Sequence, residues 1–188
     1  MDNPDESEMR KHSIALIGFR ATGKSLIGRL LAEALGMELV DMDEELVARL
    51  GQDINTWVGK HGWESFREAE SELLTALSRR KNLVLATGGG IVLRADNRKM
   101  LKDGFLVVWL KASPETIHSR LVLDPKTSSN RPPLTGLSLE EEIRRVSEER
   151  FPLYMETADL DLVTEERPLP DLVSVVQAVW ANENEDQS

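Results

Sequence analysis

The chain has 188 residues, a length that suits one compact α/β domain with a core of its own. It contains no cysteine, which excludes a disulfide framework, a thiolate metal site and a cysteine nucleophile. Its formal net charge of -10 argues against binding nucleic acid through a basic face.

Both ends of the chain are acidic and lack an apolar pattern, so residues 1–11 and 181–188 are predicted to be disordered tails. Residues 12–180 form the one predicted domain. The N-terminal tail has no apolar signal core, and no apolar run approaches the length of a membrane span. We therefore expect a cytoplasmic protein that binds neither membranes nor nucleic acid. Because no apolar heptad pattern or stripe is evident, we also expect a monomer.

Short apolar runs alternate with helical patterns in the first half of the chain, which predicts a parallel sheet flanked by helices. Gly36 is expected to end the first helix. Two short helical pieces are expected between residues 43 and 60. The other expected elements are strands at residues 13–17, 38–40 and 83–86 and helices at residues 24–35 and 64–80.

The second half of the chain continues this alternation. Ser113 and Pro114 suit a helix start, the first as N-cap and the second in the first turn. Residues 124–136 are rich in Pro, Ser, Thr and Asn, which predicts a mobile loop. A helix at residues 138–156 is expected to be bent or broken near Pro152. The remaining expected elements are helices at residues 95–101 and 169–180 and strands at residues 105–110 and 160–163.

Residues 18–25, GFRATGKS, lie directly between the first predicted strand and the first predicted helix. They satisfy the phosphate-loop pattern G-x-x-x-x-G-K-[ST]. Glycines let backbone N–H groups wrap phosphates, and the helix N-terminus adds its positive end. We expect Lys24 to bridge the β- and γ-phosphates of a nucleotide and the Ser25 hydroxyl to bind Mg²⁺.

This loop is common to kinases, GTPases and motor ATPases, so other segments must distinguish them. The chain has no N-K-x-D signal for guanine, and its third predicted strand ends in Thr87 rather than in an Asp-Glu pair. The carboxylate for the metal must come from elsewhere, and Asp41 at the end of the second strand is the candidate. With the small size of the chain, this favours a nucleotide-dependent kinase of small molecules.

Asp41 and Asp43 are two residues apart after the second strand. In an extended segment such residues point to the same side, so both carboxylates are expected to face the ligand cleft at the carboxyl end of the sheet. One would hold Mg²⁺ through water, and the other would orient an acceptor hydroxyl and take its proton. The alternative is that Asp43 caps the helix that follows.

Two further segments suit an anionic acceptor. Arg67 and Glu70 are three apart on a predicted helix, where they form either a surface ion pair or a carboxylate-binding arginine with its orienting acid. Gly88, Gly89 and Gly90 follow the third strand. Three consecutive glycines favour close approach of the backbone to a ligand, with a sharp turn as the alternative.

Three other arginines are candidates with plain alternatives. Arg131 in the irregular loop either reaches the transferred phosphate or stays exposed. Arg150 lies beside an apolar cluster and either binds the acceptor or forms a salt bridge. Arg120 either stacks on adenine or is solvated.

The phosphate loop, Asp-x-Asp, Phe-Arg-x-x-Glu, Gly-Gly-Gly, Arg-Pro and Arg-x-x-Leu-Tyr follow one another in this order between residues 14 and 180. In this order the motifs resemble those of shikimate kinases. The resemblance implies a P-loop fold of the nucleoside-monophosphate-kinase type, with a five-stranded parallel sheet in the order 2-3-1-4-5. It also implies phosphate transfer from ATP to the 3-hydroxyl of shikimate, with Mg²⁺, in the pathway to chorismate and the aromatic amino acids.

The resemblance also implies roles for individual residues. Catalysis is expected from Lys24, Asp43 and Arg131, and the metal is expected at Ser25 and Asp41. Shikimate would lie in the segment at residues 43–67, under a lid at residues 124–136. The acceptor-binding residues would be Asp43, Arg67, Gly88, Gly89, Gly90 and Arg150. The ATP-binding residues would be Gly18, Ala21, Thr22, Gly23, Lys24, Ser25, Leu26, Arg120 and Arg131.

The sequence departs from the family pattern at three places. Arg20 and Ala21 replace a frequent Met-Gly pair, Trp63 replaces the usual acid, and Val58 stands where an aromatic residue is common. None of these changes removes a reacting group, but they leave substrate preference open. The remaining alternatives are another small-molecule kinase of the same fold, such as a gluconate kinase, and a noncatalytic ATP-binding regulator.

Overall fold

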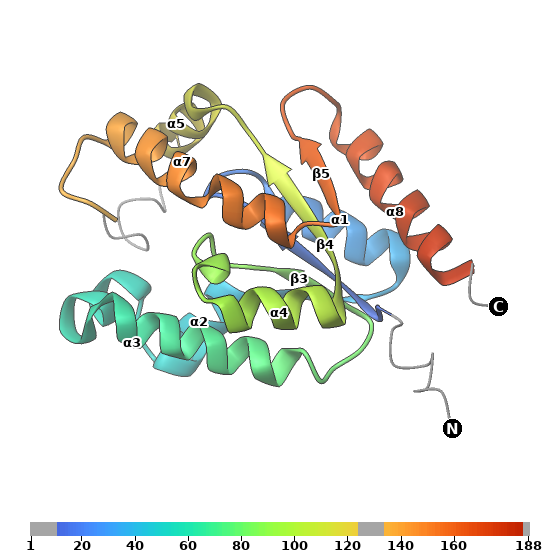
Figure 1. The fold of residues 1–188 in the computed structure, drawn as a ribbon, viewed down its shortest axis with the longest axis horizontal. Helices are drawn as coiled ribbons and strands as arrows, with labels where there is room; N and C mark the ends of the chain where they lie inside the picture. Colours follow the sequence, from blue (N-terminus) through green and yellow to red (C-terminus); the bar gives the residue numbers. More distant parts are fainter. Residues whose placement is uncertain (1–10, 124–133, 186–188) are drawn as a thin grey trace.

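The computed structural model describes residues 11–123 and 134–185, which build a five-stranded parallel sheet flanked by helices (Figure 1). The strand order is β2-β3-β1-β4-β5, which confirms the predicted fold class. Parallel pairing in register brings Ile14 opposite Val84 of one neighbouring strand and Leu106 of the other. The strands are β1 (Ser13–Ile17), β2 (Glu38–Asp41), β3 (Leu83–Ala86), β4 (Phe105–Lys111) and β5 (Leu160–Val163).

Helices cover both faces of the sheet, as Figure 1 shows. Helices α1 (Lys24–Leu35) and α8 (Leu169–Glu185) pack together on one face. Helices α2 (Met42–Leu50), α3 (Ile54–Leu77) and α4 (Ala95–Gly104) lie on the other face. The remaining elements are η2 (Ile91–Leu93), α5 (Pro114–Leu123) and α7 (Leu139–Thr157). No helix in the described ranges is both long and apolar enough to cross a membrane.

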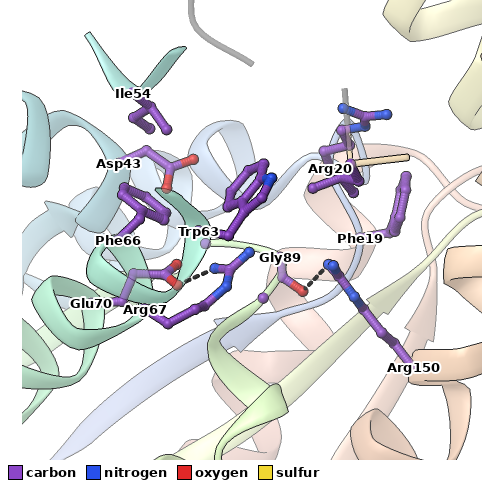
Figure 2. Close-up of a pocket in the computed structure, with 13 residues that line it drawn as sticks. Phe19, Arg20, Asp43, Ile54, Trp63, Phe66, Arg67, Glu70, Gly89 and Arg150 are labelled. Atoms are coloured by element: carbon purple, nitrogen blue, oxygen red, sulfur yellow. Dashed lines mark hydrogen bonds and ion pairs between the residues drawn. The ribbon is translucent and has the colours of Figure 1, made fainter. Parts of the chain in front are cut away.

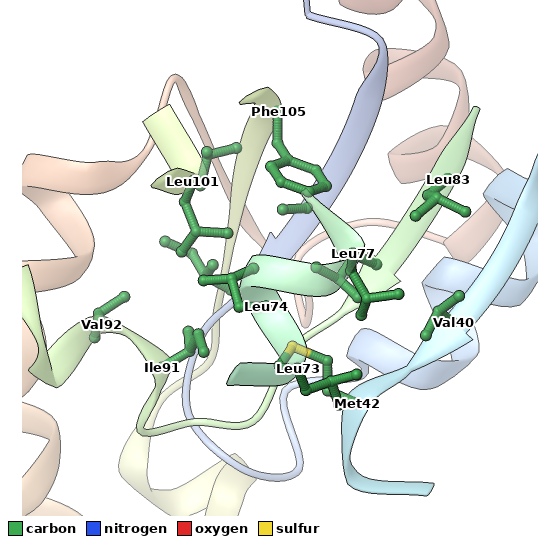
Figure 3. Close-up of a cluster of buried hydrophobic side chains, with 14 of the residues drawn as sticks. Val40, Met42, Leu73, Leu74, Leu77, Leu83, Ile91, Val92, Leu101 and Phe105 are labelled. Atoms are coloured by element: carbon green, nitrogen blue, oxygen red, sulfur yellow. The ribbon is translucent and has the colours of Figure 1, made fainter. Parts of the chain in front are cut away.

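The core has two parts because side chains of each strand alternate between the faces of the sheet. In β1, Ile14 and Leu16 pack with α1 and α8, whereas Ala15 and Ile17 pack with α3. Figure 3 shows the second part, in which α3 inserts a row of leucines among side chains from the strands and η2. The α3 residues of this row are Leu73, Leu74 and Leu77. Burial of these leucines holds α3 against the sheet, and so it also positions the helical turns that come before them.

Four predicted elements have the bounds that the structure shows: β1, α1, β3 and β5. The extended segment predicted through Asp43 is wrong, because α2 begins at Met42 and Asp41 caps it. The Asp41 carboxylate accepts hydrogen bonds from the backbone N–H groups of Asp43 (3.1 Å) and Glu44 (3.5 Å). The N-cap alternative was therefore correct in kind, but it applies to Asp41 rather than to Asp43.

Other helices also differ from expectation. Helix α8 runs to Glu185, so the disordered tail predicted from residue 181 is wrong for residues 181–185. Helix α3 joins one of the predicted pieces to the longer helix, with a kink at Gly62, whose φ of 79° and ψ of 168° are not helical. Helix α7 continues past Pro152 without a break. A proline inside a helix costs about 3 kcal/mol, and buried residues on both sides, Val146 and Tyr154, offset this cost by anchoring α7.

Candidate functional site

The phosphate loop lies at the carboxyl end of β1 and leads directly into α1, as predicted. Gly18 has φ 138°, and a Cβ atom there would overlap the carbonyl oxygen of Leu110, so only glycine fits. The Lys24 ammonium group donates hydrogen bonds to the carbonyl oxygens of Gly18 (2.9 Å) and Phe19 (2.7 Å). Lys24 thus keeps the loop curved around the N-terminus of α1, and a helix N-terminus suits a phosphate group.

Ser25 and Asp41 meet beside this loop. The Ser25 hydroxyl donates a hydrogen bond to the carboxylate of Asp41, which comes from the end of β2. Mg²⁺ prefers oxygen ligands and usually keeps several waters, so a hydroxyl with a carboxylate behind it fits this ion. The predicted metal pair is therefore brought together, and its chemistry suits Mg²⁺.

A pocket opens next to the phosphate loop, and Phe19 and Arg20 belong to both the pocket and the loop (Figure 2). It lies where β1 and β3 end, which is where open α/β sheets bind ligands. The predicted acceptor residues all line it: Asp43, Arg67, Gly88, Gly89, Gly90 and Arg150. The other lining residues are Ile54, Trp63, Phe66, Glu70 and Leu134.

Arg67 is held in place on one side of the pocket. Its guanidinium group forms an ion pair with Glu70, one turn later on α3, and lies over the ring of Trp63 at 5.1 Å from the centroid. A Cβ atom on Gly90 would overlap this guanidinium group, and one on Gly88 would overlap the Glu70 carboxylate. Gly88 and Gly90 are therefore required by the close approach of this backbone to α3. The sequence analysis had predicted a close approach to a ligand instead.

Arg150 reaches the pocket from the opposite side (Figure 2). It donates a hydrogen bond to the carbonyl oxygen of Gly89 at 2.8 Å, and the Tyr154 hydroxyl donates to the same oxygen at 2.6 Å. Arg150 and Arg67 thus flank one short stretch of backbone, Gly89–Gly90. Two guanidinium groups in this arrangement can bind a carboxylate between them.

Comparisons with known proteins agree with this arrangement. A family model described as shikimate kinase matches residues 20–180. The chain belongs to the shikimate kinase family. A shikimate kinase of Oleidesulfovibrio alaskensis is 49% identical over 145 residues, which is 77% of this chain and 84% of that protein. One of Nitratidesulfovibrio vulgaris is 40% identical over 168 residues, which is 89% of this chain and 95% of that protein.

The fold also matches that of a solved shikimate kinase. The shikimate kinase from Acinetobacter baumannii in complex with shikimate superposes with a TM-score of 0.84 and 36% sequence identity, covering 95% of this chain and 98% of that chain. Membership of the shikimate kinase family makes the chain an enzyme, a phosphotransferase that uses ATP. Neither alternative from the sequence, a kinase of another family or a noncatalytic regulator, is needed to account for these matches.

The remaining ATP-site predictions from the shikimate kinase resemblance have mixed outcomes. Arg120 donates hydrogen bonds to the carbonyl oxygen of Ala21 (3.1 Å) and to the Thr164 hydroxyl (3.2 Å), so it lies against the phosphate loop. Leu26 is half exposed on α1. Arg131 falls outside the described residues, as does most of the predicted lid. Stacking of Arg120 on adenine stays a prediction.

Sequence reasoning gave several pocket residues no individual role. Ile54 and Phe66 lie in the predicted acceptor segment at residues 43–67, Phe66 within the Phe-Arg-x-x-Glu motif, and Leu134 lies in the predicted lid. As single apolar residues they are indistinguishable from core residues in one sequence. Trp63 stood out only as a departure from the shikimate kinase pattern, and it packs against Arg67, four residues later on α3. Arg20 stood out only in the same way, although it lines the pocket.

Glu70 is expected to make acceptor binding depend on pH. Burial raises the pKa of Glu70 to about 7, and the neighbouring Arg67 opposes this rise. Below pH 7 the carboxyl gains a proton and loses its ionic hold on Arg67. We therefore expect the KM for the acceptor to rise by about tenfold between pH 8 and pH 6, since ~1.4 kcal/mol corresponds to one decade. Steady-state kinetics of the wild type and Glu70→Gln across this range test the prediction.

The glutamine variant is the control because its side chain does not titrate. Its acceptor KM is expected to be high and independent of pH between 6 and 8. If Glu70→Gln shows the same rise in KM toward low pH as the wild type, another group causes the pH dependence.

Proposed function

We propose that this enzyme transfers the γ-phosphoryl group of ATP to the 3-hydroxyl of shikimate, in the pathway to chorismate and aromatic amino acids. The observation that carries the proposal is one pocket, adjoining the phosphate loop, in which Asp43 faces a space lined by Arg67 and Arg150. The similar enzyme from Acinetobacter baumannii was solved in complex with shikimate, which supports the same acceptor here.

The acceptor would bind by its charge and by its hydroxyl groups. Arg67 and Arg150 would hold the shikimate carboxylate from two sides, next to the Gly89 backbone. The Asp43 carboxylate lies close to Gly88, because a Cβ atom on that glycine would be 3.1 Å from it. The two arginines and Asp43 would together orient a ring that carries one carboxylate and several hydroxyls.

In the proposed reaction the 3-hydroxyl oxygen forms a bond to the γ-phosphorus as the bond to the ADP oxygen breaks, and Asp43 takes the hydroxyl proton. Lys24 leaves the loop carbonyl groups to bind the phosphates and neutralise their growing charge. Ser25 would bind Mg²⁺ through its hydroxyl, and Asp41, which is hydrogen-bonded to Ser25, would bind the ion through water. The metal supplies charge neutralisation on the phosphates when it is bound. Arg131 as a further charge-stabilising group remains a prediction, as do the cytoplasmic location and the monomeric state.

A coupled assay of ADP release with shikimate, quinate and gluconate tests the function. We expect ATP-dependent turnover with shikimate, weaker turnover with quinate, which has a similar ring, and none with gluconate. Faster turnover with gluconate would show a kinase of another acceptor. Binding of ATP without turnover of any of the three would instead show a noncatalytic nucleotide-binding protein.

A further inference from the structure

Glu142, in the first turns of α7, is a buried carboxylate with an unusual set of partners. It forms an ion pair with Arg20 of the phosphate loop. It also accepts hydrogen bonds from the backbone N–H groups of Leu134 (2.8 Å) and Thr135 (2.9 Å) and from the Thr135 hydroxyl (3.3 Å). One side chain thus connects two segments that are more than one hundred residues apart in the sequence.

Both charged side chains of this ion pair are largely buried, so breaking the pair would be costly. The Glu142 side chain is 3% exposed and that of Arg20 is 12% exposed. A buried carboxylate is strongly destabilising unless it is paired and hydrogen-bonded, and the partners of Glu142 meet this requirement. Moving either connected segment would break bonds to a charge that water cannot reach. The two segments are therefore expected to hold one position relative to each other.

Both connected segments belong to the acceptor pocket. Arg20 and Leu134 line it, and Arg20 follows Phe19, whose carbonyl oxygen accepts a hydrogen bond from Lys24. Figure 2 shows Arg20 directing its guanidinium group away from Arg67 and Arg150, so its charge serves the ion pair rather than the space between those two arginines. The pocket wall and the phosphate-binding loop are thus joined through Glu142.

We propose that Glu142 is a positioning residue that couples acceptor binding to nucleotide binding, acting through Arg20 on the phosphate loop and through Leu134 and Thr135 on the pocket wall. The inference rests on the proposed function, because it takes shikimate as the acceptor. A nucleotide that binds the phosphate loop acts on the segment that carries Arg20, and Glu142 transmits a shift of this segment to the wall against which shikimate lies. Binding of ADP therefore raises the affinity for shikimate, and the reverse holds equally by linkage.

The test compares the wild type with Glu142→Gln, Arg20→Met and the double variant. Glutamine keeps the size of Glu142 but not its charge, and methionine is frequent at the Arg20 position in the family resemblance. We measure kcat, the KM for shikimate, and the shikimate affinity with and without saturating ADP, using tryptophan fluorescence because Trp63 lines the pocket. Each single variant is expected to raise the shikimate KM about tenfold, to leave kcat within about threefold, and to abolish the affinity gain from ADP.

The double variant is expected to add little to either single change, because the two residues act as one pair. Glu149→Gln is the matched control, since its ion pair with Arg145 lies on the same helix but is exposed. It should match the wild type in every measurement. Unfolding midpoints are recorded for all variants, so that loss of stability is measured separately from loss of coupling.

Two results would overturn the inference. The first is a lower unfolding midpoint in Glu142→Gln with an unchanged shikimate KM and ADP effect, which would make Glu142 structural only. The second is normal coupling in Arg20→Met, which remains informative if Glu142→Gln does not fold. Failure of the proposed function is distinguishable from both, because the wild type itself would then show no turnover of shikimate.

Discussion

Lys24→Met is expected to lower kcat by about 10²–10³-fold, the usual effect of removing one group that stabilises transition-state charge. The Lys24 ammonium group already points into the curve of the phosphate loop, where it binds the carbonyl oxygens of Gly18 and Phe19. Methionine has a similar length but no charge, so it can neither hold these oxygens nor bind the β- and γ-phosphates. The KM for ATP is expected to rise as well.

The same substitution leaves two loop carbonyl groups without their donor, which costs about 1–3 kcal/mol of unfolding free energy. This is less than the stability of an ordinary domain, so the variant is expected to fold. Kinetics, ATP titration calorimetry and thermal unfolding together separate the catalytic from the structural effect. Lys99→Met serves as control because Lys99 is exposed on α4. A Lys24→Met enzyme with kcat within tenfold of the wild type would refute the phosphate role.

Asp43→Asn is expected to lower kcat by about 10²–10⁴-fold, the range for losing a positioned general base. Asparagine fills the same space and keeps the backbone N–H that Asp41 caps, so α2 should remain intact. The contacts of the phosphate loop come from Lys24, Ser25 and Asp41, so ATP affinity is expected to change by less than about threefold.

Glu44→Gln provides a matched control for this change, since it removes one negative charge from the next residue of the same helical turn, and Glu44 is exposed. Rates are measured with shikimate and ATP in both variants. Full activity in Asp43→Asn would show that the proton leaves by another route and that Asp43 does not act on the acceptor.

The sequence predicted most of the fold because its signals are local. The buried run Ser13–Ile17, the phosphate loop and the glycine at position 36 each determine their own structure. Parallel strands alternating with helices then permit few arrangements. The predicted site residues Asp43, Arg67 and Arg150 lie in one pocket because each follows or packs against the carboxyl end of a neighbouring strand.

What the sequence could not predict depends on contacts between distant segments. Asp41 and Asp43 look equivalent as Asp-x-Asp, yet capping of α2 directs one toward Ser25 and leaves the other in the acceptor pocket. Pro152 predicts a bend or a break on local grounds, and packing keeps α7 continuous across it. In the sequence Glu142 is one acid of an acidic helix start, and only its burial beside Arg20 suggests the role proposed for it.

The backbone turn at Gly62 separates one segment of the pocket lining from the rest of α3. The arm before the turn, residues 54–61, begins at a helix cap made by Asp53 and carries Ile54 into the pocket. Lys24, Asp43, Arg67 and Arg150 all lie outside this arm. Replacing this arm with that of a relative is therefore expected to change which ring the pocket admits, while the residues proposed to perform the chemistry stay the same.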